Sequence, residues 1–140
     1  MKKVLLSVLA VLVLICGGLM LPGCTPNDKS IDKALADVVN EINAVCPITV
    51  DSETRLDNCV ALPGKNIRYN YTLVNFANGD LSESQITQIK DELRPSIINQ
   101  IKSASDMQKF RDYEVTIKYV YKSNDSFELF SITVAPKDYK

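Results

Sequence analysis

The stretch Ala61–Val74, which reads ALPGKNIRYNYTLV, contains the clearest strand pattern in the sequence. Apolar or aromatic side chains occupy every second position of its strand-like part, at Ile67, Tyr69, Tyr71 and Leu73. Such alternation is typical of a β-strand with one buried face. The preceding residues 63–66 place proline and glycine side by side, which favours a tight turn. The sequence therefore predicts a strand over 67–74 that forms a hairpin with the chain before it.

Further strands are predicted on both sides of this hairpin. Residues 54–62 alternate, and the side chains expected on one face are Leu56, Asn58, Val60 and Leu62, with Arg55, Asp57, Cys59 and Ala61 on the other. Residues 48–50 form a short candidate strand. A second hairpin is predicted over 115–134, with its turn at 123–125. Within its return strand the apolar side chains shift from one set of alternate positions to the other, which predicts a bulge near Leu129 or burial on both faces.

Two amphipathic helices flank the first hairpin. Residues 31–45 carry apolar side chains at steps of three and four, and Ser30 is the expected cap of this helix. A second helix is predicted from Ser82, which forms a capping box with Gln85. Pro95 lies inside this second pattern and predicts a kink or two short helices. The expected fold is an α+β two-layer domain, with an antiparallel sheet of four to five strands, helices on one face and the order α-β(β)β-α-β-β.

The first residues have a different character. Lys2 and Lys3 precede thirteen residues, 4–16, of which only Ser7 is polar, and this is the pattern of an export signal. The following Leu21-Pro22-Gly23-Cys24 resembles the lipobox of bacterial lipoproteins. The resemblance implies cleavage by signal peptidase II before Cys24, a diacylglyceryl group on the Cys24 thiol and acylation of the new amine. The alternative is an uncleaved membrane-spanning helix over 4–22, which two glycines and Pro22 weaken.

These boundaries give a lipoprotein signal peptide at 1–23, a lipidated tether at 24–30 and a single α+β domain at 31–140. Without Lys2 and Lys3 the chain has 14 basic and 17 acidic residues, a formal charge of −3, so nucleic acid is not an expected partner. Cys16 is lost with the signal, which leaves Cys46 and Cys59. In an oxidising compartment this pair predicts a disulfide, and two free buried thiols are the alternative.

Little in the sequence points to catalysis. The chain has no histidine, which excludes Ser-His and Cys-His nucleophile pairs, and neither a metal site nor a cofactor is predicted. Three carboxylates lie close in sequence, at Asp51, Glu53 and Asp57, but a solvated loop paired with Arg55 explains them better than an active site or calcium site. Four tyrosines at matching parity form either a recognition surface or part of the core: Tyr69, Tyr71, Tyr119 and Tyr121. We favour the core, because they share their parity with aliphatic side chains.

The residues 46–51, 54–57 and 69–73 are also similar to small exported proteins of unassigned function in Gram-negative bacteria, a resemblance that implies no activity. The sequence thus predicts a non-enzymatic protein of the bacterial envelope that binds an unknown protein partner. A lipid on Cys24 is expected to anchor it to a membrane, with its domain outside the cytoplasm. An inhibitor or immunity-type lipoprotein that blocks one enzyme or toxin is an alternative. A carboxylate-based hydrolase is a further and weaker one.

Overall fold

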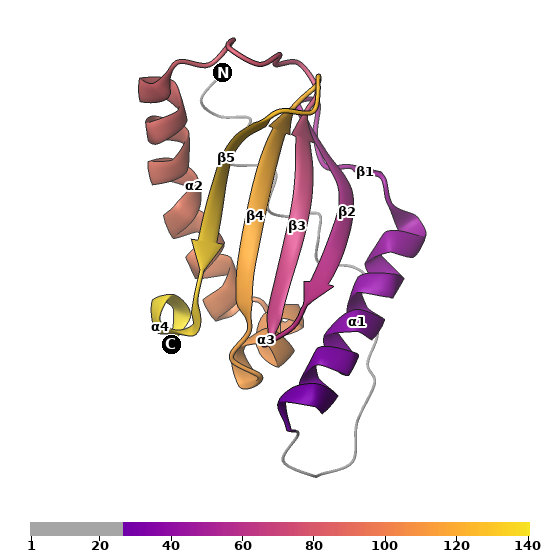
Figure 1. Cartoon of the computed structure of the whole chain (residues 1–140). Coiled ribbons are helices and arrows are strands. Elements are labelled where there is room, and N and C mark those ends of the chain that lie inside the picture. Colours follow the sequence, from indigo (N-terminus) through magenta and orange to yellow (C-terminus); the bar gives the residue numbers. More distant parts are fainter. Residues whose placement is uncertain (1–26) are drawn as a thin grey trace.

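The computed structural model describes residues 27–140, and the predicted signal peptide and Cys24 lie outside this range. The elements follow the predicted order and confirm the α+β fold class (Figure 1). In chain order they are α1 (Asp28–Val45), β1 (Ile48–Thr49), β2 (Thr54–Leu62), β3 (Asn66–Leu73), α2 (Glu83–Ser103), η2 (Ser105–Met107), α3 (Gln108–Asp112), β4 (Thr116–Ser123), β5 (Glu128–Val134) and α4 (Pro136–Tyr139).

The five strands form one sheet in the order β1-β2-β3-β4-β5. The pairs β1–β2, β2–β3 and β4–β5 are antiparallel, as predicted, but β3 and β4 are parallel, so the sheet is mixed and not antiparallel throughout. The physical reason lies in the connection. The chain leaves β3 and passes through α2 before it enters β4, and a long crossover of this kind is what a parallel pair requires.

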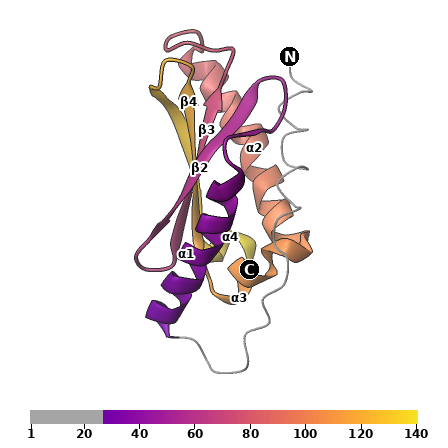
Figure 2. The ribbon, with the colours of Figure 1, turned by 90° about the vertical axis from the view of Figure 1, so that its right-hand side faces the viewer.

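The domain has two layers. Figure 2 shows the helices gathered on one side of the sheet, and within residues 27–140 no helix lies on the other side. Helix α1 packs along β2 at one margin of the sheet, and α2 packs beside β5 at the other margin (Figure 1). The core fills the space between the layers with aliphatic and aromatic side chains, including Leu35, Ile97 and Ile117. We call the helix-free side of the sheet the open face.

Strand β2 contains a bulge that the sequence does not reveal. The register with β3 shifts between Leu56 and Asn58, which leaves Asp57 as the extra residue. An inserted residue reverses the alternation of the side chains beyond it. Leu56 and Cys59 are therefore both buried under the helices, although strict alternation placed them on opposite faces, and that part of the prediction is wrong.

The return strand β5 also has a bulge, and here the prediction is confirmed. Tyr121 pairs with Phe130 and Lys122 pairs with Glu128, so Leu129 is the extra residue. The bulge allows Phe130 to face the core even though the apolar parity changes along the strand.

Helix α1 begins three residues earlier than Ile31, the first residue of the predicted helix. The Asn27 side chain accepts a hydrogen bond of 2.9 Å from the Ser30 amide, so Asn27 and not Ser30 is the N-cap. The predicted apolar stripe is buried at Ile31, Leu35, Val39 and Ile42. The first helix therefore begins within the range 24–30 that the sequence assigned to a tether.

Helix α2 has the predicted capping box between Ser82 and Gln85. It runs without interruption through Pro95, so the expectation of two short helices is wrong. Leu93, Ile97 and Ile101 face the sheet, and this burial offsets the hydrogen bond that proline removes. Across residues 27–140, no helix combines the length and the apolar character needed to cross a membrane.

Candidate functional site

The four tyrosines lie together on the inner face of the sheet. Tyr69 pairs with Tyr119 and Tyr71 pairs with Tyr121 across the parallel strands. Their rings stack, with centroids 5.5 Å apart in the first pair and 5.1 Å apart in the second. Phe130 on β5 extends the stack, 4.7 Å from Tyr121. All four tyrosines are only 2–8% exposed, so the structure places them in the core under the helices and not on an exposed surface.

Burial controls the chemistry of these phenols. Removal from water raises the pKa of Tyr71, Tyr119 and Tyr121 well above the usual value near 10, and neighbouring ionisable groups raise it further. For Tyr121 the neighbouring group is the carboxylate of Asp51. The three phenols are therefore neutral under physiological conditions and act as aromatic packing groups with a polar tip.

This burial predicts an alkaline transition. Burial, followed by the Glu114 carboxylate, also raises the pKa of Tyr139 to about 12, and unfolding returns each phenol to about 10. Below pH 10 all these phenols are neutral in the folded and in the unfolded state, so their ionisation does not make the free energy of unfolding depend on pH. Above pH 10 the unfolded state loses protons first, so that free energy falls as the pH rises.

We expect phenolate absorbance from these tyrosines to appear together with the loss of circular dichroism above pH 10. Both signals should be recorded on one sample. Complete ionisation of the tyrosines near pH 10, with the circular dichroism of the native protein retained, would contradict their burial.

The two remaining cysteines lie at the junction of α1 and β2. Cys46 is the C-cap of α1, and Cys59 is buried on β2. The Asn43 side chain ties the helix to the strand, since it donates a 2.9 Å hydrogen bond to the Cys59 carbonyl and accepts a 2.7 Å bond from the Cys59 amide. Sequence analysis missed this role of Asn43, because an asparagine near a helix end carries no specific signal for such a contact.

The structure has both cysteines as free thiols, so their disulfide stays a prediction. Burial first, and then the Asp57 carboxylate, raises the pKa of Cys46. Burial and the neighbouring Cys46 raise the pKa of Cys59 far above its usual value. Thiols in this environment are mostly protonated, which argues against a nucleophilic role for either one.

The disulfide prediction can be tested by melting. A bridge between Cys46 and Cys59 would stabilise the domain by about 3 kcal/mol, which corresponds to about 10 °C for a domain of this size. We expect a reducing agent to lower the melting temperature of air-oxidised protein by about this amount. The variant Cys46→Ser is the control and should melt at one temperature with and without reductant. If the air-oxidised wild-type protein melts at the same temperature with and without reductant, the two thiols stay free.

The carboxylates near residue 55 do not converge on a common point. Asp51 accepts hydrogen bonds from the amides of Glu53 and Thr54 and so closes its own turn. Asp57 pairs with Arg55 at 2.6 Å and also accepts a hydrogen bond from the Thr72 hydroxyl. These contacts give Asp51 and Asp57 structural roles at separate places. Within residues 27–140 there is also no group of three or more acidic, cysteine or histidine side chains arranged to hold a metal ion.

Comparison with solved structures finds the same fold in other bacterial proteins. A candidate secreted protein from Pseudomonas aeruginosa superposes with a TM-score of 0.65 at 10% sequence identity, over 84% of this chain and 100% of that one. The type II secretion system pilotin EpsS from Vibrio vulnificus gives 0.61 at 10% identity, over 81% of this chain and 94% of the pilotin. The type II secretion system pilotin AspS from Vibrio cholerae gives a TM-score of 0.57 at 10% identity, over 79% of this chain and 94% of the pilotin. At this identity the similarity establishes a shared fold.

Sequence comparison gives a family. No curated protein sequence matches the chain significantly. A family model described as a domain of unknown function, DUF8479, matches residues 29–130, which extend from the first turn of α1 to the first three residues of β5. The chain belongs to the DUF8479 family.

Proposed function

We propose that this protein is a lipid-anchored component of the bacterial envelope that acts by binding a protein partner, in the manner of a pilotin, and not as an enzyme. The observation that carries the proposal is the position of the lipobox-like motif relative to the fold. Cys24 lies three residues before Asn27, which caps the first helix of the domain. A lipid on Cys24 would hold the folded domain directly at a membrane, as expected for a protein that works on a membrane-bound assembly.

The fold supports the same proposal. Two of the superposed proteins are described as pilotins of type II secretion systems. We infer from this similarity that the partner is a component of an envelope assembly. An inhibitor of a single toxin would instead bind that toxin. The chemistry of the described side chains agrees with a binding role, because the buried phenols and thiols are neutral and the acidic groups near Arg55 are engaged in structural contacts.

The direct test is purification of the tagged, full-length protein from its native membranes in mild detergent, followed by identification of the proteins that accompany it. We expect enrichment of a membrane-bound component of an envelope assembly, and we expect the reciprocal purification through that component to recover this protein. An unrelated lipoprotein with the same tag is the control. If the accompanying proteins are the same for both, or if reciprocal purification fails, the proposed partner-binding function is wrong.

A further inference from the structure

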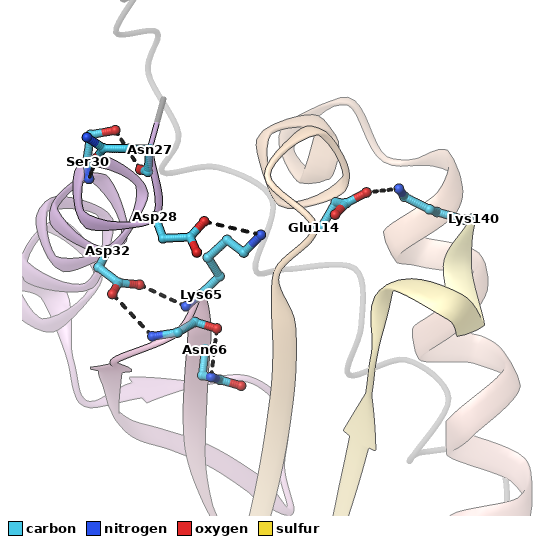
Figure 3. A network of polar contacts seen from close by, with 9 residues as sticks. Asn27, Asp28, Ser30, Asp32, Lys65, Asn66, Glu114 and Lys140 are labelled. Carbon is cyan, nitrogen blue, oxygen red and sulfur yellow. Dashed lines mark hydrogen bonds and ion pairs between the residues drawn. The ribbon is translucent and has the colours of Figure 1, made fainter. Parts of the chain in front are cut away.

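The end of the domain at which α1 begins is built from several distant segments, which we call the helix-start end: residues 27–33, 62–66, 108–116 and 135–140. The Asp32 carboxylate accepts hydrogen bonds from the amides of Gly64 at 3.2 Å and Lys65 at 2.8 Å. The Lys65 ammonium lies 3.6 Å from Asp28 (Figure 3). The backbone carbonyl of Lys65 accepts a 2.9 Å hydrogen bond from the Thr116 amide. The first turn of α1, the β2–β3 turn and the start of β4 are thereby joined.

The C-terminal segment belongs to the same end. Lys140 forms an ion pair with Glu114, just before β4 (Figure 3). The Tyr139 hydroxyl donates a 2.7 Å hydrogen bond to the carbonyl of Val115. Hydrogen bonds and ion pairs therefore link these four segments near the start of α1.

Three loops form the opposite end, which we call the tip: residues 50–54, 74–83 and 123–128. The Val74 amide donates a 2.8 Å hydrogen bond to the Glu53 carbonyl, and the Asn124 amide donates a 2.8 Å bond to the Phe76 carbonyl. Strands β3 and β4 both run from the helix-start end to the tip, and each has eight residues. At about 3.3 Å per residue, the two ends are about 25 Å apart.

The two ends differ in charge. The tip contains six carboxylates and no lysine or arginine. These acidic residues are Asp51, Glu53, Asp80, Glu83, Asp125 and Glu128. The helix-start end contains seven basic residues against five carboxylates. Its basic residues are Lys29, Lys33, Lys65, Lys109, Arg111, Lys137 and Lys140, and its acidic residues are Asp28, Asp32, Asp112, Glu114 and Asp138.

We infer that the domain stands on a membrane with its helix-start end against the lipid headgroups and its tip directed away from them. This inference rests on the proposed lipid anchor at Cys24. Three residues separate Cys24 from the helix cap at Asn27, and a fully extended chain of that length reaches at most about 11 Å. The lipid therefore holds the start of α1 close to the membrane surface.

The charges at the two ends of the domain favour this orientation. Electrostatic interactions of exposed charges decay over about 8 Å at physiological ionic strength. In the inferred orientation the tip lies about three such lengths from the headgroups, so its six carboxylates do not experience an anionic surface. A domain lying on its side would bring several of them within range. The basic excess at the helix-start end, in contrast, is attracted to anionic headgroups.

One consequence concerns the partner. In this orientation the tip and its exposed Phe127, which is 56% exposed, point away from the lipid surface. The open face of the sheet stays uncovered as well (Figure 2). Both surfaces are then accessible to a protein, whereas the helix-start end is not.

The test measures the distance of each end from the headgroups. Full-length lipidated protein is reconstituted in vesicles of phosphatidylethanolamine and phosphatidylglycerol that contain a nickel-chelating headgroup lipid. A spin label is attached at Lys29→Cys in the helix-start end or at Glu128→Cys in the tip. Both positions are exposed, and each substitution removes one charge. The parent protein gives the background labelling of its own cysteines.

We expect nickel to relax the label at position 29 at least about twofold more strongly than the label at position 128, since the ends are about 25 Å apart. Equal relaxation, or stronger relaxation at position 128, in protein that floats with the vesicles would overturn the inferred orientation and leave the lipid anchor intact. Protein that purifies without lipid and does not float with the vesicles would overturn the anchor itself, and the orientation with it.

Discussion

Replacement of Cys24 by alanine is expected to abolish the incorporation of labelled palmitate into the protein. The reason is chemical. In the lipoproteins that residues 21–24 resemble, the cysteine thiol is the group that receives the diacylglyceryl chain, and alanine has no atom that could form this thioether. Two or three acyl chains are also what a lasting membrane attachment requires. Gel autoradiography after growth with labelled palmitate measures the incorporation, which should fall to background.

Cys16→Ala is the matched control, since Cys16 lies in the predicted signal peptide and is removed with it. This variant should incorporate as much label as the wild-type protein. Full labelling of Cys24→Ala, or loss of label in Cys16→Ala, would contradict the assignment of Cys24 as the lipidated residue.

Leu56→Ala is expected to lower the free energy of unfolding by about 3 kcal/mol, because the truncation of a buried leucine removes apolar contacts and leaves a cavity. Leu56 is 0% exposed on the inner face of β2. For a domain with an ordinary stability of 5–15 kcal/mol, a loss of about 3 kcal/mol is large. Chemical denaturation of the two proteins under identical conditions measures the difference.

Val60→Ala is the control for this prediction. Strict alternation would place Val60 on the same face as Leu56, but the bulge at Asp57 moves it to the open face, where it is half-buried. Its truncation should cost less than about 1 kcal/mol. A similar cost for both substitutions would mean that β2 is regular and that the bulge is absent.

The sequence predicted those elements whose signal is local. The apolar stripe from Ile31 to Ile42 predicted α1, and the alternation from Ile67 to Leu73 predicted β3, because each pattern repeats with the period of its own backbone. The capping box of α2 was also readable, since its two residues are three positions apart. Tyr69, Tyr71, Tyr119 and Tyr121 alternate in step with aliphatic residues, so the sequence also predicted that they belong to the core. The structure buries all four.

Features that depend on distant segments could not be predicted in this way. Parallel and antiparallel strands show the same alternation of side chains, so nothing within β3 or β4 reveals that the two strands are parallel to each other. The bulge at Asp57 depends on pairing with β3, and the contact of Asn43 with Cys59 depends on the packing of α1 against β2. The joined segments of the helix-start end are likewise a product of the tertiary fold.

In the proposed function, a fatty-acylated Cys24 attaches this partner-binding domain to a bacterial membrane. The intact mass of the protein purified from its native membranes measures whether this lipid is present. We predict a chain that begins at residue 24 and carries the added mass of a diacylglyceryl group, with or without a further acyl chain on the amine. A chain that still contains residues 1–23 and has an unmodified Cys24 would contradict the claim.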